Sequence, residues 1–238
     1  SKIATIPIIR KYINLQQKVL LDESVEAQKV LLDESVKAQG ELKVIFTSKP
    51  KKLVLDIAKK LIDIAVSSGC DAVKFQKRNV EKVYAQEFLS QPRESPWGTT
   101  QRDQKMGLEF SEKEYKIIDN YCKKRKILWY LSCWDVDSQI QMRKFNTKYN
   151  KVASAMLVHT KLLKEIAKER KHTFISTGMS TIKDIESAIK IFKKFKCPFE
   201  LLHSHSSYPM PVDEANLKVI QTLQKKFKCK IGYSGHET

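Results

Sequence analysis

The sequence predicts an α/β protein with a (β/α)8 TIM-barrel architecture, of which about seven βα units are present. From about residue 42, short apolar runs alternate with longer segments of helical periodicity, which is the pattern of parallel βα units. The chain has 238 residues, enough for one such domain and too few for two large ones. Lysine, serine and histidine residues recur where the apolar runs end, and parallel barrels collect their functional groups at these places.

The expected strands are short runs of apolar residues. They cover residues 42–48, 72–76, 128–133, 151–156, 173–177, 199–203 and 230–233. Helices are expected at residues 53–67, from Ser111, near Asp137, at 161–169, from Thr181 and at 213–227. A closed barrel needs eight strands, so this series predicts that the barrel is truncated.

Two of the helix starts are marked by capping residues. Ser111 stands three residues before Glu114, which is the spacing of a capping box. Thr181 precedes Ile185 and Ile189, which lie on one apolar stripe at helical spacing. Both positions therefore predict a helix that begins at a defined residue.

Two segments depart from the βα pattern. Residues 79–108 form a long polar connection, which in a compact domain is typical of a functional or disordered loop. Residues 18–28 and 29–39 are an eleven-residue tandem repeat with one change, rich in helix formers. We expect an N-terminal helical extension at residues 1–41, followed by the barrel at residues 42–238. The repeat is either a partner-binding helix or a recent duplication without a specific role.

The composition restricts the classes of partner. The net charge is +17, but the lysines are spread over all the expected helices, so a solvated surface that steers anions is favoured over nucleic-acid binding. No apolar run approaches the ~20 residues of a membrane span, and the N-terminus lacks a signal-peptide core. The five cysteines are scattered without CxxC spacing, which argues against a disulfide scaffold or a zinc ribbon. We expect a cytoplasmic protein.

Functional side chains are expected at the carboxyl ends of the predicted strands. Lysine offers a positive charge to a carboxylate or phosphate, and serine offers a donor without bulk. Neutral imidazoles from separate strands can hold a divalent ion. The residues at these positions are Lys74, Gln76, Ser132, Lys151, Ser154, Ser176, His203, His205 and His236. They predict a site for an anion and a metal, whereas His172, at a strand start, is expected to be structural and the role of His159 is open.

Seven segments of the chain form a recognisable set. They are DAVKFQKR (71–78), PRESPWGTTQR (92–102), LEFSEKEY (108–115), YNKVASAM (149–156), FISTGMST (174–181), LLHSHSSYPMPVDEANL (201–217) and IGYSGHET (231–238). In this order and spacing, from about residue 55 to residue 238, they resemble the N-acetylneuraminate (sialic acid) synthase family. The resemblance implies condensation of phosphoenolpyruvate with an N-acetylated hexosamine, giving a nine-carbon 2-keto sugar acid and phosphate. It also implies a homodimer at full length.

The resemblance assigns roles to individual residues. It implies that His203 and His236 bind a divalent metal, Mn²⁺ with Mg²⁺ as the alternative, and that these two histidines are catalytic together with Lys74 and Lys151. The residues implied to hold phosphoenolpyruvate are Lys74, Ser132, Lys151, Ser154 and Ser176. Gln76 and Tyr208 match the positions that face the sugar. Met156 stands where some relatives carry a glutamate.

The sequence departs from the family at both ends. The first strand normally carries a Glu-Ile-Gly and Asn-His-x-Gly signature, and residues 44–53 read VIFTSKPKKL instead. The last barrel strand and the C-terminal antifreeze-like domain do not follow within these 238 residues, so we expect this chain alone to be poorly active. The alternatives are a Schiff-base aldolase that uses Lys74 or Lys151, and a degenerate fragment or basic binding module without activity.

Overall fold

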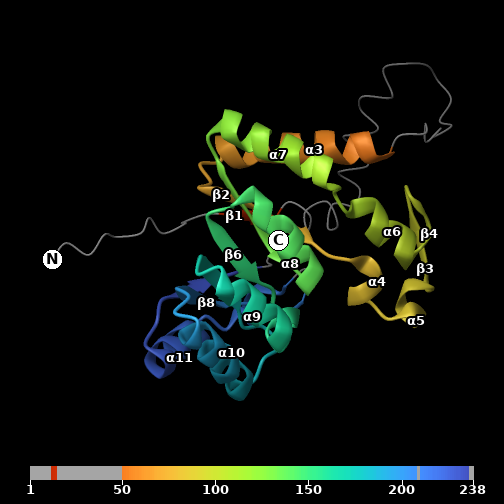
Figure 1. The fold of residues 1–238 in the computed structure, drawn as a ribbon. Coiled ribbons are helices and arrows are strands. Elements are labelled where there is room, and N and C mark those ends of the chain that lie inside the picture. Colours follow the sequence, from red (N-terminus) through yellow and green to blue (C-terminus); the bar gives the residue numbers. More distant parts are fainter. Residues whose placement is uncertain (1–11, 15–49, 208–209, 236–238) are drawn as a thin grey trace, which may run out of the picture. The chain divides into compact units, whose positions relative to one another are not determined.

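The fold is described from a computed structural model of the chain, in which residues 12–14, 50–207 and 210–235 are placed (Figure 1). The chain divides into two compact units, one of Ser1–Phe75 with Glu87–Trp129 and one of Gln76–Gln86 with Tyr130–Thr238. Strands β2 (Ala72–Lys77) and β5 (Leu128–Cys133) each begin in the first unit and end in the second. The units are therefore described in turn.

The first unit packs helices against aromatic residues of β2 and β5. Strand β1 (Tyr12–Asn14) pairs in parallel with β2, and the N–H of Leu128 donates to the carbonyl of Asp71 at the start of β5. Helices α3 (Pro50–Ser67) and α7 (Glu112–Arg125) lie side by side in Figure 1. The rings of Phe110, Tyr115 and Trp129 surround Phe75 edge-on at 6.0–6.2 Å between centroids. Burying such large rings supplies much of a small core.

The segment expected as a long loop is ordered into short elements. It contains α4 (Val80–Val83), α5 (Gln86–Leu89), the antiparallel strands β3 (Pro92–Ser95) and β4 (Gly98–Thr100), and α6 (Gln101–Leu108). Thr100 begins α6 with a capping box, because its hydroxyl accepts from the N–H of Asp103 and the Asp103 carboxylate accepts from the N–H of Thr100. Of the two alternatives for this connection, a disordered loop is wrong, because local caps and a hairpin order the segment.

The second unit contains the regular βα series. After β5 come α8 (Val136–Met142), the 3₁₀ turn η1 (Arg143–Phe145), β6 (Tyr149–Val152), η2 (Ser154–Met156) and α9 (Thr160–Lys168). They are followed by β7 (His172–Ser176), α10 (Ile182–Lys194), β8 (Phe199–His203), η3 (Val212–Ala215), α11 (Lys218–Phe227) and β9 (Ile231–Tyr233). Strands β5 to β9 are neighbours in chain order and run parallel. The predicted α/β class with parallel strands is confirmed.

The apolar core of this unit lies between its strands and helices. Val152, Ile175 and Leu201 come from successive strands and pack with Ile166 of α9 and Phe192 of α10, all at most 1% exposed. Figure 1 shows α9, α10 and α11 gathered near β8. Burial of such side chains stabilises the unit by ~1.5–3 kcal/mol each before entropy is counted. This core identifies the helix-facing side of each strand.

Several predicted boundaries change. The strand expected at residues 151–156 is β6 at Tyr149–Val152, and Ser154–Met156 turns away as η2. The helix expected at 213–227 is interrupted at Asn216, whose φ of 44° is left-handed, so η3 and α11 are separate. The strand expected at 42–48 and the repeat at 18–39 lie outside the described residues, while β1 is a strand within the segment expected to be helical. Truncation of the barrel stays a prediction.

Candidate anion-binding site

Strand registers show which side chains share a face of the second unit. Val152 pairs with Ile175, and Ile175 pairs with Leu201, so these core residues define the helix-facing side. Register partners in a parallel sheet project to the same side, and successive residues alternate. Lys151, next to Val152, and Ser176, next to Ile175, therefore project to the opposite side. This side is called the inner face below.

The inner face brings three predicted residues together at neighbouring strands. Leu131 of β5 pairs with Asn150 of β6, so Ser132 lies beside Lys151 one step further along both strands. Lys151 pairs with Phe174, and Ser176 follows two residues later at the carboxyl end of β7. Lys151 is 6% exposed. A lysine and two serines thus line adjacent strand ends, as the sequence predicts.

The two serine hydroxyls have an unusual environment. Ser132 is 0% and Ser176 is 1% exposed, and neither Oγ has a hydrogen-bond partner in the structure. A buried polar group without a partner costs about 1–3 kcal/mol, and most buried polar atoms in proteins are paired. Two such hydroxyls on one face, beside a buried lysine, favour a site where a small anion or water accepts their hydrogen bonds.

Gly178, in the loop after β7, marks a point where three connections converge. A methyl group at Gly178 would lie 2.8 Å from the main-chain oxygen of Ser204 and 2.9 Å from Oγ of both Ser154 and Ser206. The predicted residue Ser154 therefore lies close to the segment that follows β8. Sequence reasoning missed Gly178 and Ser206, although a glycine directly after a strand in FISTGMST was a readable signal of close backbone approach.

The residues of β2 are divided between the units. Lys74 is 2% exposed and belongs to the first unit, on the face of β2 opposite to Phe75. Gln76 is 4% exposed and belongs to the second unit. Each is buried as expected of a site residue. Tyr208 and His236 lie outside the described residues.

His203 is the last residue of β8 and is 7% exposed. It pairs with Tyr233 of β9. Its Nε2 lies 2.8 Å from the carbonyl oxygen of Ala215 in η3, and its ring is tilted by 34° against the ring of Tyr233 at 5.8 Å. The ring is therefore held at the carboxyl end of β8, where the sequence predicts a site residue.

The metal-binding prediction stays a prediction, because His236 lies outside the described residues. Within residues 12–14, 50–207 and 210–235, no group of three or more His, Cys, Asp or Glu residues could hold a metal ion. A histidine that donates one ring nitrogen to a carbonyl can bind a metal through the other. The hydrogen bond of His203 is therefore compatible with a ligand role.

Two other histidines receive structural roles. His159 begins α9, and its Nδ1 accepts from the N–H of Leu162 at 3.3 Å, which settles the role that the sequence left open. His172 begins β7, and its Nε2 lies 3.5 Å from a carboxylate oxygen of Glu200. His172 is at the amino end of its strand, away from the predicted site, as expected.

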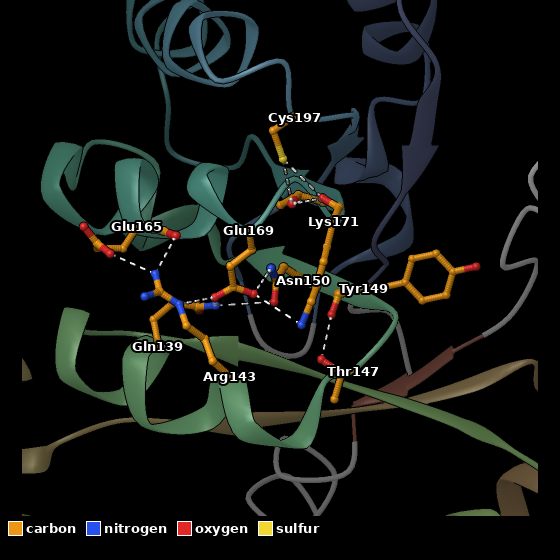
Figure 2. Close-up of polar contacts among 10 residues, drawn as sticks. Gln139, Arg143, Thr147, Tyr149, Asn150, Glu165, Glu169, Lys171 and Cys197 are labelled. Carbon is orange, nitrogen blue, oxygen red and sulfur yellow. Dashed lines mark hydrogen bonds and ion pairs between the residues drawn. The ribbon is translucent and has the colours of Figure 1, made fainter.

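A buried cluster of ion pairs and hydrogen bonds lies on the helix-facing side of β6, where it includes Asn150. Figure 2 shows Glu169, 7% exposed at its side chain, among Gln139, Arg143 and Asn150. Its carboxylate accepts from Gln139 Nε2 at 2.7 Å, Arg143 Nε at 2.9 Å and Asn150 Nδ2 at 3.0 Å, and Lys171 Nζ lies 3.4 Å away. Burial raises the pKa of Glu169, but these hydrogen bonds and the Lys171 charge outweigh it and hold the pKa below its ordinary value. The carboxylate is therefore charged at neutral pH.

The fold and the inner face together define a class. This is a parallel α/β protein with a buried, lysine- and hydroxyl-lined site at the carboxyl ends of its strands, which suits a small anion. The sequence profile of the NeuB family matches residues 61–238, and the chain belongs to that family.

Individual relatives agree with the family assignment. The chain is 34% identical over 187 residues to N-acetylneuraminate-9-phosphate synthase of Mus musculus, covering 77% of this chain and 52% of that protein. It is 34% identical over 188 residues to N,N'-diacetyllegionaminic acid synthase of Campylobacter jejuni, covering 76% and 56%. The sialic acid synthetase of Leptospira borgpetersenii, solved with citrate, has a TM-score of 0.69 and 31% identity, covering 79% of this chain and 62% of that one. The chain spans about half the length of the curated relatives that it matches.

One further finding concerns membranes. Among the helices of the described residues, none is both long and apolar enough to cross a bilayer.

Proposed function

We propose that this chain contributes the phosphoenolpyruvate-binding part of an enzyme that condenses phosphoenolpyruvate with an N-acetylated hexosamine. The products are a nine-carbon 2-keto sugar acid and phosphate, in sialic acid or related nonulosonic acid biosynthesis. The observation that carries the proposal is the pair of buried, unpartnered hydroxyls of Ser132 and Ser176 on the same inner face as Lys151. Family membership and the names of the relatives support the reaction class.

The proposed roles follow from the chemistry of each side chain. Lys151 supplies a fixed positive charge in a buried setting, where an anion gains more from it than in water. Ser132 and Ser176 donate hydrogen bonds to phosphate or carboxylate oxygens, and Ser154 adds a third hydroxyl near the loop of Gly178. These residues are proposed to hold the anion in a fixed position, because positioning lowers the entropic cost of the reaction. Lys74 and Gln76 are proposed to complete the phosphoenolpyruvate and sugar contacts, with Tyr208 on the sugar side.

The metal remains a separate part of the proposal. The resemblance implies Mn²⁺ or Mg²⁺, which would polarise the sugar carbonyl as a Lewis acid. We propose His203 and His236 as its ligands from this chain. The anion-binding roles of Lys151, Ser132 and Ser176 do not depend on the metal.

The sugar is proposed at the level of its class. The relatives are named for a 9-phosphorylated product and for a diacetamido product, so N-acetylmannosamine, its 6-phosphate and a diacetamido-trideoxyhexose are the candidates to assay. A homodimer is proposed for the full-length protein.

Calorimetric binding of phosphoenolpyruvate to the purified chain tests the proposal. We expect Ser132→Ala and Ser176→Ala each to lower affinity by about 10- to 100-fold, because a hydrogen bond to a charged group contributes about 1.5–3 kcal/mol. Neither variant should be less stable by more than about 1 kcal/mol, since each removes a buried hydroxyl that has no protein partner. Ser187→Ala, on the exposed side of α10, is the matched control and should bind as the wild type does.

Two results would contradict the proposal. If both variants bind phosphoenolpyruvate as tightly as the wild type, the hydroxyls do not form the anion site. If borohydride traps a pyruvate adduct on Lys151, the chemistry is that of a Schiff-base aldolase instead.

A further inference from the structure

The segments that follow strands β2 and β5 are joined by the carboxylate of Asp135. Asp135 is the N-cap of α8 and is 6% exposed, and its Oδ1 accepts from the N–H of Ser138 at 2.8 Å. Its Oδ2 accepts from the N–H of Asn79 at 2.7 Å, although Asn79 lies 56 residues away in the chain, just after β2. An N-cap needs only the first of these bonds. The bond from Asn79 is therefore a separate tie, and both of its ends belong to the second unit.

This tie lies just beyond a paired stretch of the two strands. The N–H of Trp134 donates to the carbonyl oxygen of Lys77 at 2.9 Å. In a parallel ladder such a bond sets a single register for the two strands, in which Gln76 lies beside Ser132. Register partners project to the same side of a sheet, so Gln76 shares the inner face with Ser132. The bond from Asn79 to Asp135 closes the two strands at the end where these side chains lie.

A buried arginine makes a second contact between the two segments. Arg78 follows β2 and is 4% exposed, and the centre of its guanidinium group lies 5.5 Å from the centroid of the Trp134 ring. It lies 5.8 Å from the centroid of the Tyr84 ring, and its Nη1 donates to the Tyr84 hydroxyl at 2.7 Å. A guanidinium group at such a distance is attracted by the face of an aromatic ring. The residue after β5 is therefore held against the residue after β2.

We propose that Asp135 is a positioning residue, which clasps the ends of β2 and β5 and so holds Gln76 beside Ser132. It acts through the register of the two strands and not by contact with the anion. Its effect on phosphoenolpyruvate binding rests on the function proposed above. Its hydrogen bond with Asn79 does not, so the clasp and the binding can be measured separately.

Asp135→Ser separates the clasp from the helix cap. Serine is a good N-cap, and its hydroxyl can accept from the N–H of Ser138. It has a single oxygen on a shorter side chain, which cannot also accept from Asn79. Asp137→Asn is the matched control, because Asp137 of α8 forms an exposed ion pair with Lys82 of α4. This pair joins the same two segments at the surface, where an ion pair contributes little.

Hydrogen exchange followed by nuclear magnetic resonance measures the clasp in the full chain. We expect the amide of Asn79 to exchange about 10-fold faster in Asp135→Ser and within about twofold of the wild type in Asp137→Asn. The amide of Ser138 should stay protected in both variants, because both keep the cap of α8.

A double-mutant cycle with phosphoenolpyruvate measures the positioning. Asp135→Ser should lower the affinity about 3- to 10-fold in the wild-type background, and less than about twofold when Ser132 is already alanine. Asp137→Asn should leave the affinity unchanged. A purely structural role would instead give the same loss in both backgrounds, because it would not act through Ser132.

The outcomes distinguish this inference from the proposed function. Unchanged exchange of Asn79 in Asp135→Ser, unchanged phosphoenolpyruvate affinity, or an equal loss in the two backgrounds overturns the positioning role. A wild-type chain that binds no phosphoenolpyruvate overturns the proposed function, while the exchange of Asn79 still decides whether Asp135 clasps the two strands.

Discussion

Glu169→Gln tests the ion-pair cluster on the helix-facing side of β6. The substitution keeps the size of the side chain and removes its charge. The two carboxylate oxygens of Glu169 serve different donors, with Gln139 and Arg143 at one and Asn150 and Lys171 at the other. A glutamine has one oxygen and one NH₂ group, so one of these donor pairs would face another donor.

The magnitude follows from burial. Removing one partner of a buried ion pair costs about 3–5 kcal/mol, because the remaining charge is left without compensation. Arg143 is 35% exposed at its side chain and keeps Glu165 as a second partner, which places the expected loss at the lower end, about 3 kcal/mol. For a domain of this size, that corresponds to a melting temperature lower by about 6–12 °C.

Thermal and urea unfolding of the chain measure this loss. Glu165→Gln is the matched control, since Glu165 of α9 pairs with the same Arg143 as Glu169, the C-cap of α9, but is more exposed, at 18% against 7%. We expect the control to lose at most about 1 kcal/mol. Equal losses in the two variants, or a Glu169→Gln loss below about 0.5 kcal/mol, would refute the reasoning from burial.

The difference in stability between the wild type and Glu169→Gln should also depend on pH. The pKa of Glu169 is lowered in the folded state, so its contribution is fully present above the ordinary carboxyl pKa of about 4.3 and is lost as the pH falls through the lower folded value. The stability difference between wild type and Glu169→Gln should be constant from about pH 7 to pH 5 and shrink below about pH 4. A difference that grows on acidification would contradict the lowered pKa.

Two further predictions concern a close approach and a buried thiol. Gly178→Ala should lower both stability, by about 1–3 kcal/mol, and phosphoenolpyruvate affinity, because the methyl would meet the main-chain oxygen of Ser204 at 2.8 Å; unchanged unfolding and calorimetric titration curves would contradict this. Burial raises the pKa of the Cys122 thiol to about 12, so this cysteine should resist thiol reagents at pH 8 until the chain unfolds. Mass spectrometry after brief labelling should find the half-buried Cys70 and Cys229 modified first.

The sequence predicts the regular elements of the second unit well, because their signals are local. Residues 128–133 and 199–203 are strands β5 and β8 with the expected bounds. Ser111 and Thr181 begin α7 and α10, each in a capping box whose second partner lies three residues later. Such signals need no knowledge of the tertiary fold.

The side of a strand was harder to predict than its position. Strand β8 reads FELLH, and Leu201 and Leu202 are both buried, so the alternation that would assign His203 to a face is hidden. Pairing with β7 and β9 depends on distant segments that local patterns do not reveal. The registers between β5, β6 and β7 likewise place Ser132, Lys151 and Ser176 on one face, which strand ends alone do not establish.

The four residues of β6 have a consequence for insertions and deletions. Asn150 and Val152 project to the helix-facing side, where Asn150 donates to the Glu169 carboxylate and Val152 packs in the apolar core. Lys151 lies between them and projects to the inner face. Because side chains alternate with a period of two, a slip by a single residue would exchange these assignments throughout the strand. The slip would move the ammonium group of Lys151 into the apolar core. It would place the amide of Asn150 or the isopropyl group of Val152 at the proposed anion site. An insertion or deletion within β6 should therefore impair both the stability of the unit and anion binding. Changes of length should be tolerated in the loops on either side of the strand.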